Sequence, residues 1–268
     1  MPNGQSRNSI ALTFERLQAS KRRAFIPYIT AGHPDPQVAL DVLTMLADEG
    51  ADVLELGVPF SDPIADGPTI QRATWQAIEK GVDIGRVIAW TAEFSAQRDT
   101  PIVLFSYLNP VLRYGPERFL QDARDAGAAG ILITDLPVDA DPELERRLSA
   151  GGLDLIRLVA PTTPRVRAVR IAEAAQGFIY YISRTGVTGE REQLRQGLRE
   201  DVETLRSVTD LPIAVGFGIS NADQARAVAE IADGVVVGSA LVRKLEEDGL
   251  SSARALAREI RTAIDAAL

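Results

Sequence analysis

Short hydrophobic runs alternate with longer amphipathic stretches from one end of the chain to the other. Each run has the length of a strand, is rich in Val, Ile, Leu or aromatic residues, and shows little polar alternation. This pattern is typical of strands that are covered on both faces. Eight such strands are predicted, at residues 24–30, 52–57, 101–107, 130–134, 153–160, 177–183, 212–216 and 233–238.

The stretches between these runs carry apolar residues at helical spacing. One face runs from Val38 to Leu46, after Asp35 as N-cap and Pro36 in the first turn. Further helix starts are expected at Gly115-Pro116, Asp141-Pro142, Thr163-Pro164 and Ser220, and the last apolar stripe is Leu256, Ile260 and Ile264. Glycines that end helices in the left-handed conformation are expected at Gly50, Gly127, Gly151 and Gly234.

Eight repeated strand–helix units predict parallel strands with helices outside them, and this length suits a (β/α)8 TIM barrel. An additional helix over residues 9–20 is expected to close the bottom of the barrel. The alternative is an open, doubly wound sheet, but its Gly-x-Gly-x-x-Gly turn is missing after the first strand, where residues 30–34 read TAGHP. With no linker or low-complexity tract, residues 1–268 are interpreted as one domain.

Composition narrows the function. The 29 Lys and Arg against 37 Asp and Glu give a net charge of −8, which disfavours nucleic-acid binding. Without cysteine there is no disulfide, thiolate nucleophile or cysteine-ligated metal, and the single histidine, His33, gives no basis for a zinc site. We find no signal segment and no apolar stretch of membrane-spanning length, so a soluble, cytoplasmic protein without a metal is expected.

Glu55 is the first candidate for chemistry. Strand alternation places Leu54 and Leu56 on one face and Val53 and Glu55 on the other. If the leucines pack under the helices, Glu55 points into the barrel mouth, where lost solvation raises its pKa toward that of a proton shuttle. The alternative is a glutamate held by a structural partner.

Asp66 is the second candidate, in the segment that follows the same strand. An aspartate before Gly67 and Pro68 is also a natural helix N-cap, and Asp62 before Pro63 suits a turn. The connection is long for a strand–helix loop of about 2–6 residues, which favours a functional role.

Glycines cluster after the last three predicted strands, in the segments SRTGVTG at 183–189, GFGIS at 216–220 and GSA at 238–240. Loops after strands seven and eight, with a short helix start, form the usual phosphate site of a barrel, and no lysine is required there. Each glycine alone is consistent with a simple turn. Aromatic residues near the strand ends are core candidates one by one, but as a set they suit a flat apolar ligand: Tyr28, Phe60, Phe105, Tyr107, Tyr180, Tyr181 and Phe217.

The motifs resemble those of the tryptophan synthase alpha subunit. The most specific match is LELGVPFSDP at 54–63, continuing through ADGPTIQ at 65–71. Supporting matches run in order along nearly the whole chain: FIPYITAG at 25–32, YLNP at 107–110, TDLP at 134–137, SRTGVTG at 183–189 and GFGIS at 216–220. That family is a (β/α)8 barrel, in agreement with the strand pattern.

The resemblance implies retro-aldol cleavage of indole-3-glycerol phosphate to indole and glyceraldehyde 3-phosphate. By motif position, Glu55 is the acid–base residue and Asp66 holds the indole N–H. The positions that match substrate contacts are Tyr28, Phe105, Tyr180, Thr188, Gly189, Phe217, Gly218, Gly238 and Ser239. Those that match contacts with a beta subunit are Pro59, Asp62, Asn109 and Pro110.

The resemblance also implies an alpha2-beta2 complex in which pyridoxal phosphate belongs to the beta subunit, while the alpha chain needs no cofactor. His33 departs from the family's usual Asp, Phe105 from a smaller aliphatic residue and Thr185 from a frequent Ser. Three alternatives remain at this point: a stand-alone lyase that releases free indole, another phosphosugar enzyme on the same barrel, or a non-catalytic activator of a beta subunit. Retention of both acids disfavours the activator.

Overall fold

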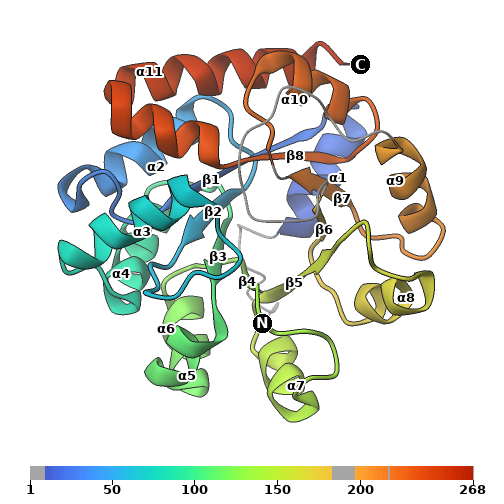
Figure 1. Ribbon diagram of the computed structural model, residues 1–268, viewed down its shortest axis with the longest axis horizontal. Coiled ribbons are helices and arrows are strands. Elements are labelled where there is room, and N and C mark those ends of the chain that lie inside the picture. The colour runs from blue at the N-terminus through green and yellow to red at the C-terminus, as the bar shows by residue number, and fades with distance from the viewer. Residues whose placement is uncertain (1–9, 183–196, 217, 268) are drawn as a thin grey trace, which may run out of the picture.

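The computed structural model describes residues 10–182, 197–216 and 218–267, in which eight parallel strands close into a barrel in sequence order (Figure 1). The strands are β1 (Ala24–Thr30), β2 (Leu54–Gly57), β3 (Ile102–Ser106), β4 (Gly130–Ile133), β5 (Asp154–Val159), β6 (Ile179–Ile182), β7 (Ile213–Gly216) and β8 (Gly234–Val237). All eight predicted strands are confirmed, each to within two residues at either end. The fold is therefore the predicted α/β TIM barrel.

Helices form an outer ring around these strands (Figure 1). They are α1 (Ile10–Ala19), η1 (Pro36–Val38), α2 (Ala39–Asp48), α3 (Pro68–Glu79), α4 (Ile84–Ser95), α5 (Leu108–Tyr114), α6 (Pro116–Asp125), α7 (Pro142–Ala150), α8 (Arg165–Glu173), α9 (Leu198–Arg206), α10 (Ala222–Ala229) and α11 (Ser239–Asp265). In the described residues, no helix is long and apolar enough to cross a membrane.

Alternation along the strands separates two apolar cores. Leu54 and Leu56 of β2 belong to the cluster between barrel and helices, whereas Val53 belongs to the cluster inside the barrel. The outward direction predicted for the two leucines is confirmed, and Glu55 between them points inward.

The predicted N-terminal helix is observed as α1, and it covers the N-terminal end of the barrel. Its buried residues Ile10, Phe14 and Leu17 belong to the inner cluster. The ring of Phe14 lies 5.8 Å from that of Phe178, which directly precedes β6. Because this end is closed by apolar packing, ligand access is left to the opposite, C-terminal end.

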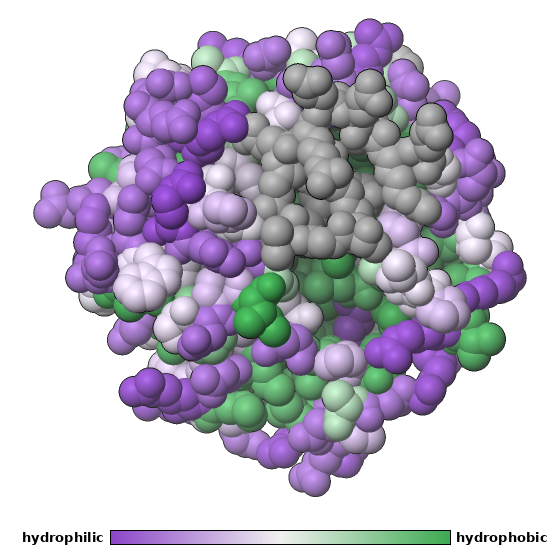
Figure 2. Space-filling model, in the orientation of Figure 1, coloured by the Kyte–Doolittle hydropathy of each residue, from purple (hydrophilic) through white to green (hydrophobic). Residues whose placement is uncertain are grey.

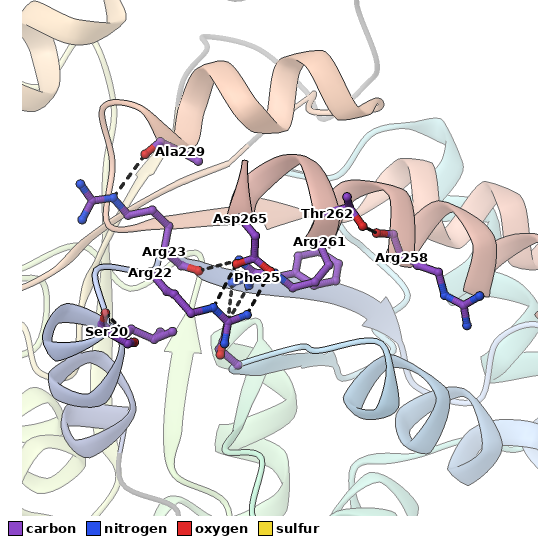
Figure 3. Close-up of polar contacts among 11 residues, drawn as sticks. Ser20, Arg22, Arg23, Phe25, Ala229, Arg258, Arg261, Thr262 and Asp265 are labelled. Atoms are coloured by element: carbon purple, nitrogen blue, oxygen red, sulfur yellow. Dashed lines mark hydrogen bonds and ion pairs between the residues drawn. The ribbon is translucent and has the colours of Figure 1, made fainter. Parts of the chain in front are cut away.

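A polar network holds α11 against the start of the barrel (Figure 3). Arg261 donates to the Asp52 carboxylate at 2.9 Å, and the same oxygen accepts the backbone N–H of Phe25 in β1. Arg261 and Arg22 also both donate to Asp265. The network joins the last helix to β1 and to the residue pair that precedes β2, and β1 is the strand that closes the barrel by pairing with β8.

Three predicted helix boundaries are wrong in detail. Gly151 has φ −74°, and the left-handed residue is the next glycine, Gly152, at φ +80°. Gly234 is the first residue of β8, where it pairs with Ala24 and Ala214 and so has extended backbone. The cap of α10 is Asn221 rather than Ser220, because the Asn221 side chain accepts the backbone N–H of Gln224.

Candidate active site

Glu55 lies inside the barrel with its side chain wholly buried. It is in register with Tyr28 of β1 and Val103 of β3. Neither carboxylate oxygen has a hydrogen-bond partner among the described residues. Burial raises the pKa of Glu55 to about 8, so at neutral pH the carboxyl is mostly protonated and able to give up a proton.

Asp66 lies in the loop between β2 and α3, 8% exposed. Its Oδ2 accepts the phenol O–H of Tyr107 at 3.0 Å. Burial raises the pKa of Asp66 to about 6, and the Tyr107 bond opposes that rise by favouring the charged form. The capping interpretation of Asp66 is wrong, because Gly67 occupies the N-cap of α3 and no side chain caps it.

Tyr107 is a site residue whose role the sequence did not reveal. Its phenol oxygen accepts the backbone N–H of Ala65 at 3.0 Å while its proton goes to Asp66. The ring packs against Phe60, with 5.3 Å between the centroids. Tyr107 therefore fixes both the loop and the acid. The sequence did hold one indication of this role. Tyr107 directly follows β3, which is the neighbour of β2, the strand that leads into the Asp66 loop.

One cavity brings the two acids together. It opens to solvent and is lined by Tyr28, Glu55, Asp66, Ile70, Phe105, Tyr180, Gly218, Val236, Gly238 and Ser239. Figure 2 shows hydrophobic side chains around a hollow near the centre of a mostly hydrophilic face. Ile70 and Val236 were not predicted, since an isolated apolar residue gives no sign that it faces a ligand rather than the core.

Three aromatic residues wall the cavity as expected. The rings of Tyr28 and Phe105 meet edge to face, with 5.2 Å between their centroids. A Cβ on Gly57 would collide with the Tyr28 phenol, and a Cβ on Gly216 with the Tyr180 phenol. These glycines let both rings lie flat against the strand ends, which shapes the cavity for a planar apolar group.

The other aromatic candidates serve elsewhere or cannot be placed. Tyr181, next to Tyr180 on β6, belongs to the outer cluster and donates to Asp201 of α9 at 2.7 Å. Phe60 and Tyr107 support the Asp66 loop. Phe217, Thr188 and Gly189 lie outside the described residues.

Gly218, Gly238 and Ser239 line the cavity and follow β7 and β8, whereas the predicted glycine segment at 183–189 lies outside the described residues. Gly218 has φ +88°, a left-handed conformation that favours glycine. Gly238 is the N-cap residue of α11 and Ser239 its first residue. A helix start presents backbone N–H groups and the positive end of the helix dipole, which together attract an anion.

The residues predicted to face a partner lie near this mouth. Asp62 and Asn109 are exposed, Pro110 is half-buried and Pro59 is buried. The Ser61 hydroxyl donates to Asp62 at 2.6 Å. Within the part of the chain that the structure describes, no group of three His, Asp or Glu side chains is placed to hold a metal ion.

A closed parallel barrel with two buried carboxylates of different pKa at its C-terminal mouth defines a TIM-barrel enzyme that performs acid–base chemistry. Its residues 14–267 match the family described as tryptophan synthase alpha chain.

Individual proteins agree with that match. The tryptophan synthase alpha chain of Chloroflexus aurantiacus is 46% identical over 260 residues, covering 95% of this chain and 98% of the relative. That of Synechococcus elongatus is 45% identical over 258 residues, with coverages of 96% and 97%. The crystal structure of tryptophan synthase subunit alpha from Legionella pneumophila is 37% identical, with a TM-score of 0.89 over 97% of this chain and 99% of that one. The chain belongs to the tryptophan synthase alpha chain family, which confirms the resemblance read from its motifs.

Proposed function

We propose that this chain catalyses the alpha reaction of tryptophan synthase, the cleavage of indole-3-glycerol phosphate to indole and glyceraldehyde 3-phosphate. The observation that carries the proposal is the state of Glu55. Its carboxyl is buried, free of partners in the described residues and shifted to a pKa of about 8, and it faces the cavity that Asp66 also lines. A lyase that must protonate a carbon atom needs an acid of this kind.

The reaction requires two proton transfers, and Glu55 takes part in both, first as the acid and then as the base. The protonated carboxyl first gives its proton to C3 of the indole ring, which leaves positive charge on the ring nitrogen. The resulting Glu55 carboxylate then takes the proton of the glycerol hydroxyl next to the ring. As that oxygen forms a carbonyl, the bond from C3 to the side chain breaks and its electron pair restores the aromatic ring. Glu55 ends protonated, as it began.

Asp66 stabilises the charge that appears midway. With a pKa of about 6 it is mostly ionised at neutral pH, when Glu55 is mostly protonated. When the substrate is bound, the Asp66 carboxylate accepts a hydrogen bond from the indole N–H and attracts the cationic ring. This interaction strengthens toward the transition state. Tyr28, Phe105 and Tyr180 hold the ring plane between them.

The phosphate of the substrate is assigned to Gly218, Gly238 and Ser239. These residues line the cavity, and Gly238 and Ser239 begin α11, where backbone N–H groups attract an anion. Roles for Thr188, Gly189 and Phe217 rest on the family motifs alone.

The reaction as written balances its protons within this chain, so we expect no cofactor here and pyridoxal phosphate only in a beta subunit. The expected partner is that subunit, in an alpha2-beta2 complex. Ile64 and Leu112 support such a surface, because they are large apolar side chains 77% and 49% exposed, close in sequence to Asp62 and to Asn109 and Pro110. We further propose that residues 1–268 form one domain that works in the cytoplasm.

The test is indole release from indole-3-glycerol phosphate by the purified chain, with and without a cognate beta subunit. Indole should form in both cases, faster with the partner. Release that the partner does not change would favour a stand-alone lyase, and no indole in either case would contradict the proposed activity. For the interface, Asp62→Ala should weaken the activation. The matched control is Asp99→Ala, an exposed acid before β3 at the opposite end of the barrel, which should leave activation unchanged.

A further inference from the structure

His33 is a buried histidine at a junction of three segments. It lies in the loop after β1, 2% exposed, and its Nε2 is 3.3 Å from the carbonyl oxygen of Val242 in α11. Val242 is three residues beyond Ser239, so His33 contacts the helix whose start faces the cavity.

The contact places a hydrogen on Nε2 of His33, because a carbonyl oxygen only accepts hydrogen bonds. Nδ1 is buried, with no partner in the described part of the chain. A second proton would create a buried N–H without an acceptor. Accordingly, burial lowers the pKa of His33, while the Val242 carbonyl, the Glu246 carboxylate and the Gln76 amide oppose the shift and Lys80 adds to it.

The side chains around His33 come from α3 and α11, the two helices that begin next to the active site. Gln76 of α3 donates to Glu246 of α11 at 2.9 Å, and Arg72 of α3 lies 3.7 Å from the same carboxylate. From the end of α3, Lys80 reaches back to the carbonyl of Pro34 and, at 3.2 Å, to the carboxylate of Asp35. The helix α3 begins two residues after Asp66, and α11 begins at Ser239.

The loop that carries His33 has little room to move. Gly32 has φ +77°, and a Cβ there would lie 2.6 Å from a methyl carbon of Val82 and 3.2 Å from the Trp90 ring. The backbone at Gly32 therefore packs closely against Trp90 of α4 and against Val82 just before this helix. Because the loop is closely packed on this side, we expect a change at the His33 side chain to act on α11.

We propose that neutral His33 is a positioning residue for anion binding, holding the first turns of α11 so that the backbone N–H groups at Gly238 and Ser239 stay aimed at the cavity. Removing the Nε2–H donor should therefore weaken anion binding. This inference rests on the proposed phosphate site at the start of α11.

Inorganic sulfate is the probe, because its charge stays constant between pH 5 and pH 8. Isothermal titration calorimetry would measure its affinity for the full-length wild type, His33→Gln and His33→Leu. Glutamine keeps an N–H donor but cannot titrate, whereas leucine removes the donor. At pH 8 wild type and His33→Gln should bind sulfate equally, and His33→Leu about two- to tenfold more weakly, as expected for one lost hydrogen bond.

Turnover separates positioning from stability. In turnover at pH 8, His33→Leu should raise KM for the phosphorylated substrate and leave kcat near that of the wild type.

Equal sulfate affinities for wild type and His33→Leu, with only the melting temperature of the variant lowered, would overturn the inference. So would a folded His33→Gln that binds sulfate more than about tenfold more weakly than wild type although it keeps a donor, a comparison that stands even if His33→Leu fails to fold. Wild type that binds no sulfate at all would overturn the phosphate site itself and, with it, this role of His33.

Discussion

Replacing Tyr107 by phenylalanine isolates the support that the fold gives to Asp66. The substitution removes the hydroxyl that donates to Asp66 and accepts from Ala65, but keeps the ring against Phe60. A hydrogen bond to a charged group contributes about 1.5–3 kcal/mol, and about 1.4 kcal/mol corresponds to one pKa unit. At the lower end of that range, loss of the bond should raise the pKa of Asp66 from about 6 by about one unit.

The loss of activity should therefore depend on pH. At pH 7 the ionised fraction of Asp66 falls from about nine-tenths in the wild type to about one half in Tyr107→Phe. The ratio of wild-type to variant kcat/KM should approach about tenfold below pH 6 and shrink toward one at pH 8, where Asp66 is ionised in both proteins. Any constant deficit that remains reports the altered position of the loop.

The assay is indole release at low substrate concentration for both proteins from pH 5.5 to pH 8.5. Titration of the substrate phosphate affects both equally and cancels in the ratio. A ratio of the two kcat/KM values that stays constant across this range would refute the claim that Tyr107 favours the charged form of Asp66.

Three further outcomes are expected. Asp66→Asn should lower kcat far more than it changes KM, because the neutral amide can accept the indole N–H but cannot stabilise the cationic ring, and steady-state kinetics would contradict this if KM rose while kcat held. The kcat/KM of the wild type should fall as pH rises through about 8, because Glu55 must be protonated to act as the acid. It should also fall as pH drops through about 6, because Asp66 must be ionised. A kcat/KM that still rises above pH 9 would exclude Glu55 as the acid. Arg261→Ala should lower the free energy of unfolding by about 3–5 kcal/mol, because it leaves Asp52 buried without its cation, whereas Arg226→Ala on the exposed face of α10 should change it by about 0.5 kcal/mol or less, as urea denaturation would measure.

The sequence predicted the barrel well because strand and helix periods are local signals. Runs such as that ending at Gly57 are bounded by turn residues, and the alternation in β2 gave the direction of Glu55. The rule that a glycine ends a helix failed at one position, where the glycine instead begins a strand. Gly234 follows a helix but starts a strand, a choice made by its pairing with Ala24 and Ala214 rather than by its neighbours in the chain.

The site was predictable residue by residue but not as a set of contacts. Asp66 had two local interpretations, and the N-cap at Gly67 together with the Tyr107 hydroxyl, 41 positions away, decides between them. Ile70 and Val236 look like any core residues in the sequence, although they line the cavity. The same holds for His33, whose partner on α11 lies 209 positions further along the chain. Pairings of this length arise from closure of the barrel, which no window of sequence contains.

The central claim is that a buried, protonated Glu55 carries out the cleavage, and Glu55→Gln tests it most directly. The amide keeps the volume of the side chain and adds no charge to a site where the glutamate is already mostly neutral, so the fold should persist. It cannot transfer a proton, which should lower the rate of indole release by about 10²–10⁴-fold. The measurement is single-turnover indole release by wild type and variant at pH 7, at saturating substrate. A loss in that range is the predicted result, and a folded variant that releases indole at the wild-type rate would contradict the account.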